Sequence, residues 1–175
     1  MKLTNVAVGM ALTALAGPAV AAMTLTSADV APNQPIPAAQ IYPRCGGQNV
    51  SPQLAWSGVP AGAKSLVLTM IDQDVKPALW SHWIVVDLPP SATGLPRGVK
   101  ALPSDAAAVI SNFGDAGYDG PCPPTGTGVH HYRFTIWAMP ARQTAIAPDA
   151  KAYTLEAWLS RAALDKASLV GWVKR

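Results

Sequence analysis

The chain has 175 residues, a length typical of one domain, and only 13% of them are charged. Its formal net charge of +3 is small, and no run of Lys or Arg is present, so a nucleic-acid-binding surface is not expected. This charge balance is compatible with a small anionic ligand. No internal repeat and no linker divides the chain, which indicates a single domain.

Residues 1–22 are predicted to be a cleaved export signal. Lys2 gives a positive start, an apolar Ala-rich stretch follows, and small residues form an A-x-A-like cleavage site after Ala21 or Ala22. The apolar stretch is broken by polar residues and is too short for a permanent span of about 20 residues. The alternative is a buried N-terminal helix. We expect residues 23–175 to form the mature domain, in the periplasm or secreted, with no integral membrane segment after cleavage.

The two cysteines, Cys45 and Cys122, both lie in Gly-rich segments. In an exported protein such a pair most simply forms one disulfide, and the alternatives are two free thiols or metal ligands. A disulfide that closes a loop of this length would restrict the unfolded chain by roughly 4 kcal/mol.

Short apolar runs between frequent prolines and glycines are typical of β-strands. Residues 23–43 are predicted to form one or two strands joined by loops. Residues 65–71 are largely apolar on both faces, which predicts a strand that is covered on both sides. Residues 82–88, ended by two prolines, and residues 132–139, ended by a third, predict two further strands.

From residue 153 the pattern predicts a helix with Thr154 as its N-cap. Its helical character is expected to continue through Lys166, before a closing apolar run at residues 169–172. Its expected buried face consists of Leu155, Trp158, Leu159 and Ala162, and its expected outward face of Glu156, Arg161 and Asp165.

All three histidines lie where loops meet predicted strands. If the strands at 65–71 and 82–88 pair antiparallel, Asp72 and His82 face each other at one rim. If the strand at 132–139 also pairs antiparallel with the first, His130 and Tyr132 reach the same rim, while alternation turns His131 to the other face. Each residue alone is more often structural than functional. Their joint placement predicts a polar pocket.

Such a pocket would suit an anion. Imidazoles, a phenol and the backbone N–H groups of the Gly-rich loop at residues 120–128 can donate to phosphate or carboxylate oxygens. Asp72 would orient a histidine or bind the cationic part of a zwitterionic headgroup. Because a protonated imidazole binds an anion better and histidine titrates near pH 6.5, we expect affinity to strengthen as the pH falls from about 8 to 6.

Several motifs resemble, in order, those of the phosphatidylethanolamine-binding proteins, and within them the bacterial Raf-kinase-inhibitor-like branch. The resemblance runs from about Gly46 to the C-terminus. It rests on GGQNVSPQLAW at 46–56, the strand ending in DQD at 72–74, WSHWIVV at 80–86, DAGYDGPCPP at 115–124 and VHHYRF at 129–134.

The resemblance implies a mainly β fold, a single-domain sandwich of two antiparallel sheets with short peripheral helices and a C-terminal helix. It also implies a preformed pocket for phosphate-type groups, including the phosphoethanolamine headgroup. Known members mostly bind or inhibit kinases, proteases or lipids and are not enzymes, so a protein partner of that type is implied. The family's pocket positions correspond here to Asp72, Trp80, His82, Pro124, His130 and Tyr132.

Three departures from the family pattern affect the pocket. Gln73 replaces the proline of a D-P-D motif, and Lys76 stands beside Pro77, so the loop is expected to be less rigid and more positive. His131 replaces an arginine that often supports the pocket through a salt bridge. The C-terminal helix matches the family at few positions.

We therefore expect an exported, non-enzymatic binding protein for a small anionic or phosphorylated ligand, without cofactor or metal. The alternative is a metal-dependent or acid/base hydrolase that uses His82, His130 and Asp72, since two histidines and a carboxylate are a recognised metal set. A third hypothesis is an inhibitor or modulator whose exposed loops around Tyr118 and Trp80 engage another protein. The sequence does not predict the oligomeric state.

Overall fold

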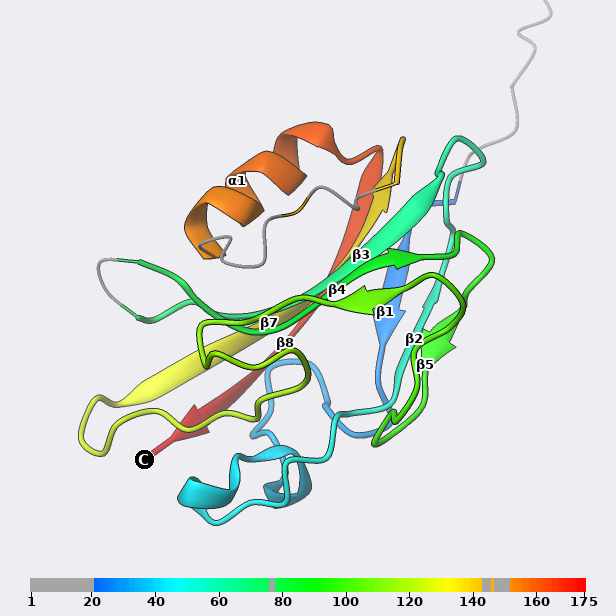
Figure 1. Ribbon diagram of the computed structural model, residues 1–175. Helices are drawn as coiled ribbons and strands as arrows, with labels where there is room; N and C mark the ends of the chain where they lie inside the picture. The colour runs from blue at the N-terminus through cyan, green and yellow to red at the C-terminus, as the bar shows by residue number, and fades with distance from the viewer. Residues whose placement is uncertain (1–20, 76–77, 143–145, 147–151) are drawn as a thin grey trace, which may run out of the picture.

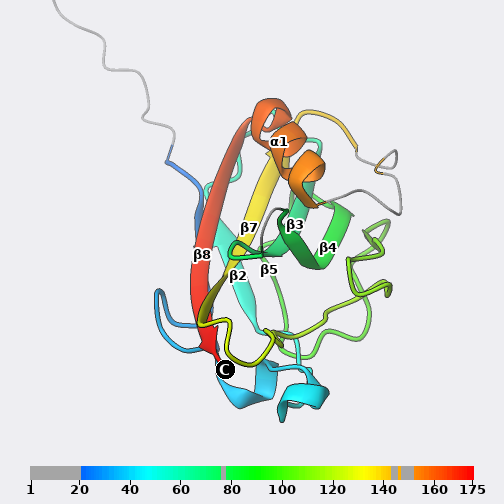
Figure 2. The ribbon, with the colours of Figure 1, turned by 90° about the vertical axis from the view of Figure 1, so that its left-hand side faces the viewer.

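A five-stranded antiparallel sheet lies at the centre of the structure, between a smaller sheet and a helix (Figures 1 and 2). This computed structural model describes residues 21–75, 78–142, 146 and 152–175. Most of the predicted export signal, and the loop residues Lys76 and Pro77, lie outside the described residues. The mainly β sandwich that the sequence and its resemblance predict is confirmed.

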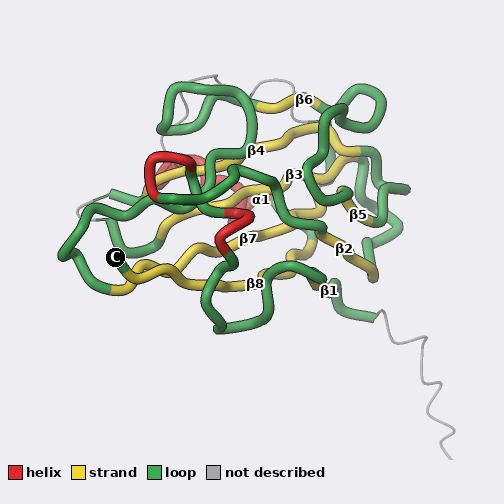
Figure 3. Tube along the Cα trace, turned by 90° about the horizontal axis from the view of Figure 1, so that it is seen from below, coloured by secondary structure: helices red, strands yellow, loops and turns green. Residues whose placement is uncertain are grey.

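The large sheet has the order β6 (Ala107–Ala108), β4 (Trp80–Leu88), β3 (Ser65–Asp72), β7 (Val129–Met139) and β8 (Asp165–Lys174). The small sheet consists of β1 (Thr24–Thr26), β2 (Leu54–Ser57) and β5 (Gly94–Leu95). Pairs of strands that follow one another in the chain, β1–β2, β3–β4 and β7–β8, are joined in the two sheets by the non-consecutive pairs β2–β5, β4–β6 and β3–β7 (Figure 3). The helices are η1 (Ala38–Gln40), η2 (Pro43–Cys45) and α1 (Ala152–Ala162).

The central strand β3 is buried at every position, as its apolar run predicts. Leu66, Leu68 and Met70 face the core between the two sheets. Val67 faces the other way and packs with Leu159 in the core beneath α1. Because a sheet and a helix cover its two faces, β3 needs apolar side chains in both alternating sets.

The predicted antiparallel pairing of the three main strands is confirmed, with two shifts of register between β3 and β4. β3 pairs antiparallel with both β4 and β7, and Asp72 lies opposite Tyr132. On the β4 side the register shifts between Met70 and Ile71, so Asp72 lies opposite Trp80 and not opposite His82. An irregularity of this kind bends a strand and re-aims its side chains, here at the rim where the three strands meet.

The C-terminal segment differs from the sequence prediction. The helix ends at Ala162, and residues 165–174 form β8, because the backbone groups along β7 need a partner strand. Thr154 lies inside the helix, which already includes Ala152, and so is not its N-cap. Trp158, expected in the core, is 43% exposed. Glu156, expected outside, is buried because Arg133 of β7 provides an ion-pair partner.

The expected disulfide joins Cys45 of η2 to Cys122. The loop that carries Cys122 approaches the η1–η2 segment very closely. A Cβ atom on Gly120 would lie 2.1 Å from the carbonyl oxygen of Gln40, so only glycine fits there. The Tyr42 N–H also donates to the Pro121 carbonyl at 3.1 Å. The loop is therefore held both covalently and by close backbone packing.

In the described part of the chain, none of the helices has the length and hydropathy needed to span a bilayer.

Candidate functional site

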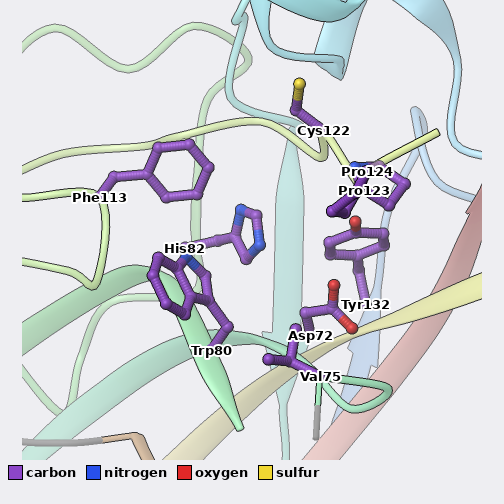
Figure 4. Close-up of a pocket in the computed structure, with 9 residues that line it drawn as sticks. All are labelled: Asp72, Val75, Trp80, His82, Phe113, Cys122, Pro123, Pro124 and Tyr132. Atoms are coloured by element: carbon purple, nitrogen blue, oxygen red, sulfur yellow. The ribbon is translucent and has the colours of Figure 1, made fainter. Parts of the chain in front are cut away.

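A cavity of about 270 Å³ opens at the rim where β3, β4 and β7 meet the Cys122 loop (Figure 4). Of the six residues predicted for the pocket, only His130 is not part of its lining. The nine lining residues are Asp72, Val75, Trp80, His82, Phe113, Cys122, Pro123, Pro124 and Tyr132. This arrangement brings residues from distant parts of the sequence to one small site.

The sequence missed four of these residues. Cys122 and Pro123 directly precede the predicted Pro124, so the Pro-rich motif contained a signal for them. Phe113 lies in a loop with no recognisable motif. Its ring centroid is 4.9 Å from that of His82 and 6.3 Å from that of Trp80, and only the tertiary structure brings these rings together.

His130 lies behind Asp72. Its Nδ1 is 2.7 Å from Asp72 Oδ2, and its Nε2 is 2.9 Å from Thr127 Oγ1. The Thr127 hydroxyl donates its only hydrogen to the Pro124 carbonyl at 2.7 Å, so Oγ1 accepts a hydrogen bond from His130 Nε2–H. His130 therefore positions Asp72 and the Pro124 loop, and both of its ring nitrogens are already bonded.

Asp72 is buried at the end of β3, and both of its carboxylate oxygens have partners. Oδ2 bonds to His130, and Oδ1 accepts the backbone N–H of Asp74 at 2.9 Å. A buried carboxylate needs such partners, because leaving its charge unpaired would strongly destabilise the fold. These bonds hold the carboxylate in place at the wall of the cavity.

His82 enters the cavity from β4 and is 3% exposed. Its Nδ1 is 2.9 Å from the Asp119 carbonyl oxygen, which can only accept, so Nδ1 carries a hydrogen. Burial lowers the pKa of His82 to about 4, although the Asp119 carbonyl and the charge of Asp72 act in the opposite direction. The ring is therefore neutral near pH 7, and its Nε2 is a hydrogen-bond acceptor. The expectation that this histidine titrates near pH 6.5 is wrong.

The Tyr132 side chain is fully buried, and its hydroxyl has no hydrogen-bond partner among the described residues. Burial raises the pKa of Tyr132, and the charge of the nearby Asp72 carboxylate and its hydrogen-bonding attraction for the phenol raise it further, so the phenol stays protonated at physiological pH. A protonated phenol can donate a hydrogen bond. Because buried polar groups are almost always hydrogen-bonded, and this one lies in the lining of the cavity, the hydroxyl is available to bond to a ligand there.

His131 faces away from the cavity, as the alternation of β7 predicts. Its backbone N–H and its Nδ1 lie 2.7 and 2.9 Å from Asp74 Oδ2. Burial raises the pKa of Asp74, but these bonds outweigh it and hold that pKa below its usual value. His131 thus ties the loop after β3 to β7, the kind of support expected from the arginine it replaces.

The two residues of the expected partner-binding surface lie in different surroundings. Trp80 is 39% exposed at the mouth of the cavity. Tyr118 is half-buried, its hydroxyl donates to the Gln40 carbonyl at 2.8 Å, and its ring packs against Trp83. Tyr118 therefore supports the fold and does not belong to an exposed loop surface.

The metal set of the hydrolase hypothesis is not assembled. Within the part of the chain that the structure describes, no three His, Cys, Asp or Glu side chains are grouped closely enough to hold a metal ion. The closest approximation, Asp72 and His130, is an internal hydrogen-bonded pair.

The chain is similar to a family of known proteins over almost its whole described length. The model of the family described as "Phosphatidylethanolamine-binding protein" matches residues 26–174. A UPF0098 protein of Methanothermobacter thermautotrophicus is 38% identical over 134 residues, 75% of this chain and 87% of that protein. A Mycobacterium tuberculosis relative named as a lipoprotein, LppC, is 38% identical over 88% of this chain and 73% of its own length. The crystal structure of Escherichia coli YbcL superposes with a TM-score of 0.81 and 30% identity, covering 89% of this chain and 99% of YbcL.

Proposed function

The chain belongs to the phosphatidylethanolamine-binding protein family, and from this we propose that it is an exported, non-enzymatic protein whose cavity binds a phosphate-type group of a small ligand. A small, mostly apolar cavity with a few converging polar groups is typical of small-molecule sites. The cavity of about 270 Å³, with Asp72, His82 and Tyr132 in its walls, has this character.

The observation that carries the proposal is the buried Tyr132 hydroxyl without a partner. A phosphate oxygen in the cavity would accept its hydrogen bond. Asp72, in the same lining, would attract an ammonium group next to the phosphate. Phosphoethanolamine-type headgroups carry both groups.

Calorimetric titration with glycerophosphoethanolamine at pH 7 tests the proposal. We expect weak binding, on the order of millimolar for so few contacts. Tyr132→Phe removes one donor and should weaken binding about tenfold, since a hydrogen bond of this kind contributes about 1.5 kcal/mol. His131→Gln, one residue away on the other face of β7, is the matched control and should bind within about twofold of wild type. No binding by wild type, or equal binding by Tyr132→Phe, would refute the proposal.

Export is supported by the A-x-A-like site after Ala21 or Ala22 and by the name of the lipoprotein relative LppC. Intact mass spectrometry of protein recovered from the periplasm should give a chain that begins at Ala22 or Met23 and lacks two hydrogens because of the disulfide. A full-length chain in the cytoplasmic fraction alone would contradict export.

A further inference from the structure

We propose that the cavity selects the singly charged, monoprotonated form of a phosphate monoester, whose P–OH group donates a hydrogen bond to His82. This inference rests on the proposed function and specifies which ionic form of the ligand the pocket takes. It follows from the donors and acceptors that the described residues direct into the cavity.

His82 presents an acceptor to the cavity. Its Nδ1–H is committed to the Asp119 carbonyl at 2.9 Å, and Nε2 has no hydrogen bond to any described residue. Figure 4 shows the edge of the ring directed into the cavity, toward Tyr132 and Asp72. An acceptor in this position needs a donor from the ligand.

The second acceptor is Asp72. Its carboxylate lines the same cavity and bonds to the His130 ring behind it. The side-chain donors among the lining residues are the Tyr132 hydroxyl and the Trp80 indole N–H. The site thus offers donors on one part of its surface and acceptors on another.

Among the lining residues that the structure describes, none is a lysine or an arginine. Arg175 approaches the outside of the wall, where its Nη1 bonds to the Pro123 carbonyl oxygen at 3.2 Å. The groups around the His82 ring are Asp72 on β3, His130 and Tyr132 on β7, the Phe113 ring, and the backbone carbonyls of Asp119 and Gly120.

A phosphate dianion fits this arrangement poorly. It has acceptor oxygens only, and at least one of them would face His82 Nε2 or the Asp72 carboxylate without a hydrogen between them. A monoester monoanion has one P–OH for His82 and other oxygens for Tyr132. A diester has the same single charge but no P–OH. The expected order of affinity is therefore monoester monoanion, then diester, then monoester dianion.

The three forms respond differently to pH. A phosphate monoester loses its second proton near pH 6, so its monoanion falls from about three quarters of the total at pH 5.5 to about 3% at pH 7.5. A diester keeps one charge over this range. His82 remains neutral across the same range because its burial disfavours the charged ring. The ligand, and not His82, therefore controls the pH dependence.

Calorimetric titration of the wild-type protein with phosphoethanolamine and with glycerophosphoethanolamine, at pH 5.5, 6.5 and 7.5 and constant ionic strength, tests the inference. We expect monoester affinity to fall about 25-fold from pH 5.5 to 7.5 and diester affinity to change less than about twofold. The monoester-to-diester ratio cancels any titration of the protein, since both ligands meet the same site. His82→Phe keeps a ring against Phe113 and Tyr132 and should bring this ratio at pH 5.5 close to one, while His131→Gln should leave it unchanged.

Three outcomes would overturn the inference while the proposed function stands. Stronger diester binding at low pH would mean that a protonated histidine binds the anion. Stronger monoester binding at pH 7.5 would mean that a cation favours the dianion. Equal, pH-independent binding of both ligands would show that His82 does not select the ionic form of the ligand. Failure of both ligands to bind at every pH would instead refute the proposed function itself. The wild-type measurements decide these cases even if His82→Phe does not fold.

Discussion

Two histidines lie at the cavity: His82 belongs to the lining on the β4 side (the β4 wall), and His130 lies behind Asp72 on the β7 side (the β7 wall). The two rings are buried to almost the same extent but bonded differently. His82 on β4 is 3% exposed and donates to a carbonyl oxygen. His130 on β7 is 5% exposed and bonds to the carboxylate of Asp72. Burial is thus equal, and the partner differs. A carbonyl supports a neutral ring, whereas a carboxylate can balance a charged one.

This difference in hydrogen bonding predicts different roles for the two walls. On the β7 side, a continuous chain of hydrogen bonds runs from Asp72 through His130 and Thr127 to the Pro124 carbonyl, so the polar groups of this network are used within the protein, whereas the Tyr132 hydroxyl on the same strand is not part of it. On the β4 wall, His82 keeps one ring nitrogen for a ligand. We therefore expect changes in the β7 network to affect mainly stability, and changes at His82 to affect mainly ligand selectivity.

The largest effect is expected where the two walls are joined. The loop from Asp119 to Pro124 bonds to both walls, and the Cys45–Cys122 disulfide anchors it. Replacement of both cysteines by serine should lower the free energy of unfolding by about 4 kcal/mol, because the bridge spans 77 residues of sequence. Urea unfolding at pH 7 measures this. A loss below about 1 kcal/mol would show that loop packing alone holds the walls together.

The next largest loss of unfolding free energy is expected from a change in the β7 network. His130→Phe leaves the Asp72 carboxylate buried without its main partner, which should cost about 3 kcal/mol of unfolding free energy. His82→Phe removes a hydrogen bond to a neutral carbonyl and should cost about 1 kcal/mol at pH 7. Urea midpoints of the two variants compare the walls directly. Equal losses would contradict the division of roles.

The pH dependence of the unfolding free energy should reveal the contribution of His82 on the β4 wall. The pKa of His82 is about 4 in the folded protein and 6.5 in the unfolded chain, so the unfolded chain binds more protons at acid pH. The contribution of this group is complete above pH 6.5 and is lost as the pH falls toward 4. Between pH 7 and 4.5 the loss should be about 2 kcal/mol. His82→Phe should lack this part of the acid destabilisation in urea titrations at both pH values. An unchanged slope would mean that the ring charges readily in the folded protein.

The smallest effect is expected at His131, beside both walls but outside the cavity. Its ion pair with Asp74 is exposed, and exposed pairs contribute at most about 1 kcal/mol. In His131→Gln the backbone N–H still bonds to Asp74. We expect a loss of less than about 0.5 kcal/mol in thermal unfolding at pH 7. A loss above about 2 kcal/mol would show that this side chain supports the pocket more strongly than its exposure indicates.

Local patterns predicted the strands well and the C-terminal segment poorly. The run from Ser65 to Ile71 predicts a strand covered on both faces, because its side chains are largely apolar on both faces, one of which packs on the small sheet and the other on the helix. The local pattern predicts part of residues 165–174 as helix. The segment forms a strand because the backbone groups at the open edge of β7 need a partner, and nothing within the segment itself indicates this. Glu156 is likewise predicted at the surface, because its ion-pair partner Arg133 lies on another element and is not part of the local pattern.

The sequence by itself determined the alternation that turns Tyr132 inward and His131 outward and the pairing of Cys45 with Cys122, and its motifs, through the family resemblance, indicated five of the residues that line the cavity. These features depend on the two-residue repeat of a strand, on an even cysteine count and on contiguous motifs. The tertiary structure alone decided that Phe113 completes the wall, that His130 lies behind Asp72, and that His82 is neutral. Those outcomes depend on the distances between segments that are far apart in the chain and on how completely these segments exclude water from the site. No local sequence pattern contains this information.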